Sequence, residues 1–309
     1  MKYKICKLSF STAVHFGSGR LSDSDTCFRA DTLFSALCIE ALKIGGKDLL
    51  DSLVKSNLRF SDGMPYLDES KYYIPKPIIT AQSDKDERES NSNVKKAFKK
   101  LKYLPADKLD DFFDCNNFYP QEKVKALGHL GKYDQKTSAC VADGKDTEPY
   151  YIGTYKFEDK CGLYVIIGCE NDDEFDLADD LLYSLGYTGI GGKVSAGLGK
   201  FTSEIVEMPA ALQKRFDGSF SKYMTLSVCM AKENELESAV DGAEYSVIKR
   251  SGFVYSYDYA DSFVKKRDFY CFAAGSCFSN KFDGDIFDVG KDGNHSVYRY
   301  AKPLLMGVM

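Results

Sequence analysis

The stretch of sequence that decides the fold is Gly189-Ile190-Gly191-Gly192-Lys193-Val194-Ser195-Ala196-Gly197-Leu198-Gly199-Lys200-Phe201. Glycine reaches backbone angles that other residues avoid, and it lets another backbone come close. A run of accessible amides beside Lys193, Ser195 and Lys200 is therefore a candidate cradle for a phosphate chain. The alternative is a plain tight connection between two elements, and the residues on either side of the stretch must decide between the two.

The glycine-rich stretch differs from the loops that bind mononucleotides and dinucleotides. A P-loop ends in Gly-Lys-Ser or Gly-Lys-Thr at a fixed spacing, and the stretch lacks that ending. The dinucleotide fingerprint follows a strand and opens a helix. Here the order is reversed, because a strand pattern at 200–206 follows the loop and an apolar helical face precedes it, made by Ala178, Leu181, Leu182 and Leu185. The loop is predicted to join a helix to a strand.

The elements expected outward from this loop follow the order of a split β-α-β unit. They are a strand at 3–10, a helix that Asp31 caps and Gly45-Gly46 ends, a strand at 58–64, strands at 151–157 and 163–168, a helix that begins near Asp172, the loop itself and a strand at 200–206. Apart from one insertion, this order resembles a ferredoxin-like fold.

Two further segments complete the predicted domain organisation. Residues 80–148 are polar and too long for an ordinary loop, and their lysines cluster around Phe98, Tyr103 and His129. We interpret them as an insertion, and a solvated helical face with a mobile loop is the alternative. After a polar joint at 209–220 the strand and helix patterns begin again. We therefore predict an α+β protein with two ferredoxin-like (RRM-like) domains, namely residues 1–208, with the insertion at about 80–148 and the glycine-rich loop 189–199, and residues 209–309.

Composition limits the function classes. The formal net charge of −5 argues against a protein that coats nucleic acid through bulk charge, although a local basic groove is compatible with it. The chain has no apolar run of membrane-spanning length and no secretory signal pattern at its start, so we expect a cytoplasmic protein without membrane contact. None of the ten cysteines forms Cys-x-x-Cys, and the three histidines lack zinc-finger spacing. We expect buried free thiols, no metal and no cofactor.

Several segments carry a resemblance to a known family. They are His15-Phe16-Gly17, Asp31-Thr32-Leu33-Phe34-Ser35-Ala36-Leu37-Cys38, Pro75-Lys76-Pro77, the glycine-rich loop, Lys249-Arg250-Ser251-Gly252-Phe253-Val254, Gly275-Ser276-Cys277-Phe278 and His295-Ser296-Val297-Tyr298-Arg299-Tyr300. In this order and at these separations they resemble the RAMP proteins of CRISPR systems, specifically the fourth-subunit family of the type III-A (Csm) effector complex. The resemblance covers the chain apart from the polar insertion.

The resemblance implies a structural RNA-binding subunit rather than an enzyme. Such proteins grip the repeat-derived 5′ tag of crRNA, seat the large polymerase/cyclase subunit and meet a backbone RAMP subunit, and a thumb-like loop separates the tag from the guide. The RNA contacts expected in this chain are His15, Gly17, Ser18, Arg20, Gly189, Gly191, Gly192, Lys193, Ser195, Gly197, Gly199, Lys200 and Arg250. For Arg250, a salt bridge to one of the abundant acidic residues is the alternative.

His15 has several candidate roles. In RAMP-fold endoribonucleases that process crRNA, a histidine can act as general base on a ribose 2′-OH. RNA binding or local hydrogen bonding, a structural role and catalysis are the alternatives for His15. Because the chain has few histidines and no evident second acid, we expect no catalytic residue. The competing functions are a metal-independent endoribonuclease that uses His15 as general base, and a protein-interaction scaffold with a vestigial groove.

Overall fold

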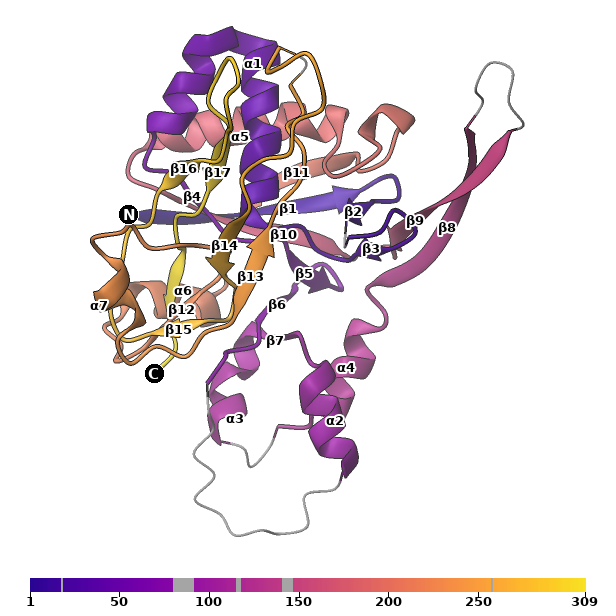
Figure 1. The fold of residues 1–309 in the computed structure, drawn as a ribbon. Coiled ribbons are helices and arrows are strands. Elements are labelled where there is room, and N and C mark those ends of the chain that lie inside the picture. Colours follow the sequence, from indigo (N-terminus) through magenta and orange to yellow (C-terminus); the bar gives the residue numbers. More distant parts are fainter. Residues whose placement is uncertain (18, 80–91, 115–117, 141–146, 257) are drawn as a thin grey trace.

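The computed structural model describes residues 1–17, 19–79, 92–114, 118–140, 147–256 and 258–309. Helices pack on sheets whose paired strands run antiparallel (Figure 1). The predicted mixture of helices and strands is confirmed. Among the helices in these ranges, none is long and apolar enough to cross a membrane.

The largest sheet has the strand order β11-β1-β10-β5-β6-β7, and β4 also pairs with β10. Its strands are β1 (Lys2–Phe10), β4 (Arg59–Phe60), β5 (Met64–Leu67), β6 (Lys71–Pro75), β7 (Tyr103–Pro105), β10 (Gly162–Cys169) and β11 (Phe201–Val206). Ile5 of β1 lies opposite Ile166 of β10 and Val206 of β11. The strands predicted around the loop are confirmed, and the strand predicted at 58–64 is divided between β4 and β5.

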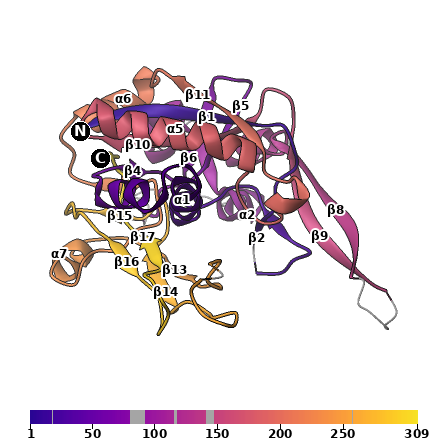
Figure 2. The same ribbon diagram turned by 90° about the horizontal axis from the view of Figure 1, so that it is seen from above.

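Two helices, α1 (Ala30–Lys55) and α5 (Asp172–Thr188), lie together on one face of this sheet (Figures 1 and 2). Their apolar side chains, with those of β1 and β10, form one buried core. Asn171 caps α5, because its side-chain oxygen accepts a hydrogen bond from Glu174 N at 2.8 Å. The helix therefore begins where its acidic first turn predicted.

The first helix differs from its prediction at both ends. It begins at Ala30 with Arg29 as the N-cap residue, so the prediction that Asp31 caps it is wrong. The Ala30 amide instead donates to Asp62 Oδ1 at 2.8 Å, which leaves the Asp31 carboxylate for other partners. Gly46, with φ 64° and ψ −150°, breaks the helix where an end was predicted. Helical structure then resumes and ends at Lys55.

Two parts project from the body of the molecule in Figure 1. The helices α2 (Ser92–Lys100), α3 (Leu109–Asp114) and α4 (Pro120–Leu127) lie across the sheet from α1 and α5. The strands β8 (Gly131–Cys140) and β9 (Glu148–Phe157) pair into a long ribbon that reaches outward. Residues 80–91, 115–117 and 141–146 of the predicted insertion lie outside the described residues.

Residues 209–309 form shorter elements. These are α6 (Ala210–Asp217), β12 (Tyr223–Thr225), α7 (Leu236–Val240), β13 (Val247–Arg250), β14 (Phe269–Phe272), β15 (Cys277–Phe278), β16 (Ile286–Asp288), β17 (Tyr298–Tyr300) and β18 (Leu305–Gly307). They pair as β15-β12-β18, β13-β14 and β16-β17. Tyr300 and Met306 belong to the same core cluster as Phe60 of the large sheet, so the two halves of the chain share a core.

The cysteines match their predicted role for the most part. Among those that the structure describes, Cys38 is half-buried, Cys140 is exposed, and the others are buried. All of them are free thiols. The tenth, Cys115, falls outside the described ranges.

Candidate nucleic-acid interface

The glycine-rich loop leaves α5 at Gly189 and enters β11 at Phe201, which confirms the predicted helix-to-strand order. Gly189 and Gly199 have φ angles of 94° and 77°. Ile190 N donates to Gly199 O at 3.0 Å, and a Cβ on Gly199 would overlap Ile190 O. These two positions therefore need glycine for the loop to close on itself.

The loop is bonded to the segment that follows β1. Gly192 N donates to His15 O at 2.8 Å, Gly199 N donates to Ala13 O at 2.9 Å, and Lys200 N donates to Thr12 Oγ1 at 3.0 Å. A Cβ on Gly192 would lie 2.6 Å from His15 Cδ2. The predicted residues near 15 and near 189–200 are far apart in the sequence, but these bonds place them side by side. Together they form one wall of the candidate site.

His15 lies inside this wall. Only 6% of the residue is exposed, and its Nδ1 is 2.7 Å from Gly153 O of β9. Local hydrogen bonding, one of the roles expected for His15, is therefore present, and its contact with RNA stays a prediction. Gly17 and Arg20 are exposed just beyond it, while Ser18 lies outside the described residues.

The loop presents unpaired backbone donors. Four amides donate to no protein acceptor in the part of the chain that the structure describes, those of Gly191, Lys193, Val194 and Ser195. Lys193 has a left-handed backbone (φ 61°), and a 3₁₀ turn, η2 (Val194–Ala196), follows it. Successive amides in such a turn form a concave site for anions. The side chains of Ser195 and Lys200 are exposed beside these amides.

A cavity of about 320 Å³ opens beside the loop. Besides loop residues, it is lined by the hairpin of β2 (Phe16–Gly17) and β3 (Ser24–Asp25), by one stripe of α1, and by Arg250 and Tyr255 from the second half of the chain. Free amides beside a partly apolar cavity can bind a phosphate and hold an unstacked base next to it. The arrangement suits a short piece of single-stranded nucleic acid.

Arg250 reaches this cavity, but its guanidinium is engaged. Its Nε and Nη2 donate to the two carboxylate oxygens of Asp31 at 2.9 and 2.8 Å, and Nη2 also donates to Thr32 Oγ1 at 3.2 Å. Arg299 Nη1 donates to the same carboxylate. The salt bridge that the sequence left open for Arg250 is therefore present, and a contact between Arg250 and RNA stays a prediction.

The electrostatics of Asp31 and Asp62 differ although both are fully buried. Burial alone would raise the pKa of Asp31, but Arg250 and Arg299 together outweigh it and hold that pKa below its usual range. At Asp62, burial prevails over the nearby Arg29 and raises the pKa. The two shifts are opposed because two arginines share the carboxylate of Asp31, whereas one arginine, Arg29, pairs with that of Asp62.

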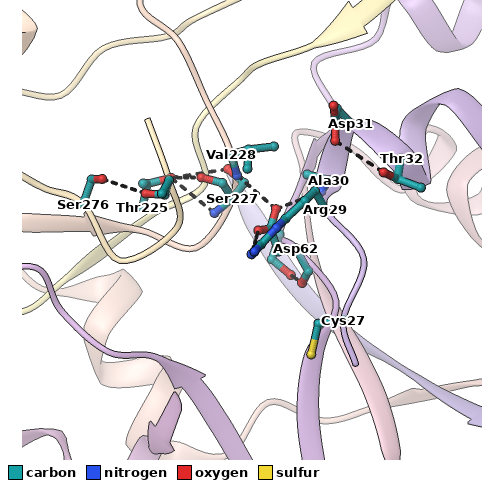
Figure 3. Close-up of polar contacts among 12 residues, drawn as sticks. Cys27, Arg29, Ala30, Asp31, Thr32, Asp62, Thr225, Ser227, Val228 and Ser276 are labelled. Atoms are coloured by element: carbon teal, nitrogen blue, oxygen red, sulfur yellow. Dashed lines mark hydrogen bonds and ion pairs between the residues drawn. The ribbon is translucent and has the colours of Figure 1, made fainter. Parts of the chain in front are cut away.

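Asp62 joins the start of α1 to the second half of the chain (Figure 3). Its carboxylate accepts hydrogen bonds from Arg29 Nη1 at 3.1 Å, from Ala30 N at 2.8 Å and from Val228 N at 3.0 Å. These bonds fix the end of α1 that borders the cavity. The geometry of the cavity therefore depends on contacts between both halves.

Some lining residues were not predicted from the sequence. Glu40, Lys43 and Thr188 line the cavity from α1 and the end of α5, and Tyr255 lines it from the second half. The apolar side of α1 was recognisable by its spacing, but the polar stripe beside it looks like an ordinary solvent face. The only sequence signal for Tyr255 was its position close behind the segment 249–254.

The comparisons with known proteins agree with this architecture. Residues 219–308 match the model of the CRISPR Csm4 C-terminal domain. The chain is 40% identical over 296 residues to CRISPR system Cms protein Csm4 of Mycobacterium tuberculosis (strain CDC 1551 / Oshkosh), covering 95% of this chain and 94% of that protein. It is 34% identical over 312 residues to the protein of the same name from Streptococcus thermophilus, covering 98% of each.

Solved structures share the fold. A chain of the Csm3-Csm4 subcomplex in the type III-A CRISPR-Cas interference complex superposes with a TM-score of 0.68 at 19% identity, covering 98% of both chains. A chain of the Csm1-Csm4 cassette in complex with AMPPNP gives a TM-score of 0.63 at 19% identity, covering 100% of this chain and 98% of that one. On the strength of the near full-length sequence relatives, the chain belongs to the Csm4 family of CRISPR proteins.

Proposed function

We propose that the chain is a non-catalytic subunit of a type III-A CRISPR interference complex that binds the 5′ tag of crRNA and anchors the large polymerase/cyclase subunit. The observation that carries this proposal is the wall of free loop amides beside the cavity. Such a wall fits a phosphate chain, and the cavity fits an unstacked base, which together are what recognition of a short, shaped RNA requires.

The proposed fold follows from the strand order of the large sheet. We infer that β1, α1, β4 and β5, β10, α5 and β11 form a ferredoxin-like domain within residues 1–208, because β1 and β10 are its central strands. Residues 209–309 are proposed to be a second, degraded unit of the same kind. The insertion is proposed to cover about residues 80–148, and the glycine-rich loop residues 189–199.

The proposed partners are crRNA, the large subunit and a backbone RAMP subunit, all of them in the cytoplasm. The solved relatives come from a Csm1-Csm4 cassette and a Csm3-Csm4 subcomplex. We propose that this chain makes the corresponding contacts with its own Csm1 and Csm3 partners. Co-purification of the tagged chain with each partner, expressed singly, tests the two contacts separately.

The experiment that tests tag binding is to purify the complex assembled on a processed CRISPR array and to sequence its crRNA. The expected result is a single fixed repeat-derived sequence at the 5′ end. A complex that carries crRNAs with random 5′ ends would contradict the proposal. A complex assembled without this chain is the control, because a fixed 5′ end that remains in its crRNA is due to other subunits.

The non-catalytic assignment rests on the setting of His15. Its ring is buried behind the loop and one ring nitrogen is engaged by Gly153 O, whereas a general base must come within hydrogen-bonding reach of the ribose hydroxyl. Repeat RNA incubated with the isolated protein in EDTA should remain intact. Cleavage that disappears in H15A would instead favour the endoribonuclease.

A further inference from the structure

The cavity beside the glycine-rich loop extends along α1 as a groove. The residues of α1 that line it are Thr32, Ser35, Ala36, Ile39, Glu40 and Lys43. Their spacing of three or four places them on one face of the helix. At about 1.5 Å per residue, the stripe from Thr32 to Lys43 is about 16 Å long.

The two ends of the groove carry different charged side chains. Arg29 and Arg250 line the end near the start of α1, while Glu40 lines the other end, beside Thr188. A carboxylate repels phosphate, and both arginines are paired with buried carboxylates, so an RNA backbone in the groove would keep to the free amides of the loop. The end at Glu40 is suited to a base edge that donates hydrogen bonds.

The hydrogen bonds of Glu40 leave it with accepting capacity. Its Oε1 accepts from Ser184 Oγ at 2.8 Å and from Thr188 Oγ1 at 3.3 Å, which fixes the carboxylate against α5. Its Oε2 is paired with Lys43 Nζ at 3.2 Å, and the Lys43 side chain is 50% exposed. The Glu40 side chain is only 5% exposed, but the half-exposed ammonium of Lys43 can turn to another acceptor beside it. When Lys43 turns aside, Oε2 can accept hydrogen bonds from a ligand in the groove.

We propose, on the basis of the RNA-binding function proposed above, that Glu40 and Lys43 select a guanine. The Watson–Crick edge of guanine presents the adjacent N1–H and N2–H donors followed by the O6 acceptor. Oε2 of Glu40 accepts from the two donors, and the ammonium of Lys43 donates to O6. Uracil is rejected, because two carbonyl oxygens flank its single N–H and face the carboxylate.

The test is selection from a library of short, randomised single-stranded RNA by the full chain. One position of the selected RNA is expected to be guanine. Replacing that guanine by inosine, which lacks the N2 amino group, should weaken binding about tenfold, the size of one good base contact. In E40Q, Ser184 and Thr188 keep the amide oxygen in place and the amide NH₂ takes the position of Oε2. E40Q should therefore lose the guanine preference and the inosine effect.

Two further variants keep the result interpretable. Glu237 of α7 is exposed and lies outside the cavity lining, so E237Q is a control with the same chemical change that should select the same RNA as wild type. K43M alters an exposed side chain and should reduce the guanine preference without unfolding the chain.

The outcomes separate this inference from the proposed function. If wild type and E40Q select the same RNA, or if wild type binds RNA without preferring guanine at any position, the guanine site is wrong although RNA binding stands. In that case Glu40 only ties α1 to α5. If wild type and its assembled complex bind no RNA, both the guanine site and the proposed function fail.

Discussion

Asp31 is a single side chain that pairs with two arginines far away in the sequence. It is fully buried and accepts hydrogen bonds from Arg250 and Arg299. Arg299 is itself buried, and its Nε and Nη2 have no partner in the described part of the chain. Without the Asp31 carboxylate, the guanidinium of Arg299 would be a buried charge with no counter-charge on it.

We therefore expect D31N to lower the free energy of unfolding by about 3–5 kcal/mol, the usual cost of removing one partner from a buried ion pair. Urea unfolding at neutral pH measures this change. D68N is the matched control, because Asp68 forms an exposed pair with Lys71 and its loss should change stability little. A D31N protein as stable as wild type would mean that both arginines find other acceptors.

The same carboxylate predicts a pH dependence. The pKa of Asp31 is lowered in the folded protein, while the unfolded value is about 3.9. A lowered folded pKa contributes stability above the unfolded pKa, and this contribution is lost as the pH falls toward the folded pKa. The difference in stability between wild type and D31N should therefore be constant near neutral pH and shrink below about pH 4. A difference that grows on acidification would contradict the ion pair.

The glycine-rich loop is the element whose backbone makes the site. Gly199 has a positive φ and no room for a Cβ, whereas Gly17 has an ordinary φ and open space around it. G199A should lower the free energy of unfolding by at least about 1 kcal/mol. G17A should change it by less than about 0.5 kcal/mol. Thermal unfolding of the two variants measures the contrast, and equal melting temperatures would contradict the loop conformation.

The same loop predicts a salt effect on RNA binding. Lys193 and Lys200 flank its free amides, and each phosphate contact with single-stranded nucleic acid adds about 0.7 to the slope of log K against log salt. The double variant K193E/K200E should bind RNA more weakly and with a slope shallower by about 1.4. K47E/K55E is a control with the same change of charge on the far segment of α1. Equal slopes in both double variants would argue against phosphate contacts at the loop.

The sequence was informative about this element and less so about the groove. Glycines between an apolar helical face and a strand pattern sufficed to predict the loop, because local backbone chemistry determines it. Asp31 was misassigned as a cap, since the carboxylate that takes that role, Asp62, comes from a different segment. Glu40 and Tyr255 could not be identified, because only the tertiary fold brings them to the loop.

Over the whole molecule, the two halves are joined by buried contacts. Tyr300 Oη accepts a hydrogen bond from Phe60 N at 2.8 Å, Asp62 accepts one from Val228 N, and a single core cluster includes residues of both halves. The full chain should unfold in a single cooperative transition that is the same by far- and near-ultraviolet circular dichroism. A fragment ending at residue 208 should lack near-ultraviolet signal. Two separate transitions, or a fragment with a native near-ultraviolet spectrum, would mean that the halves fold independently.

The cavity is lined by both halves of the chain, since Arg250 and Tyr255 line it together with the glycine-rich loop. A ligand seated there can bind only when the halves are docked, so its binding free energy is added to the stability of the entire chain. At about a hundred times its Kd, such a ligand adds about 2.7 kcal/mol. RNA in the groove would then hold the two halves together, and the melting temperature of the protein would rise with the RNA concentration.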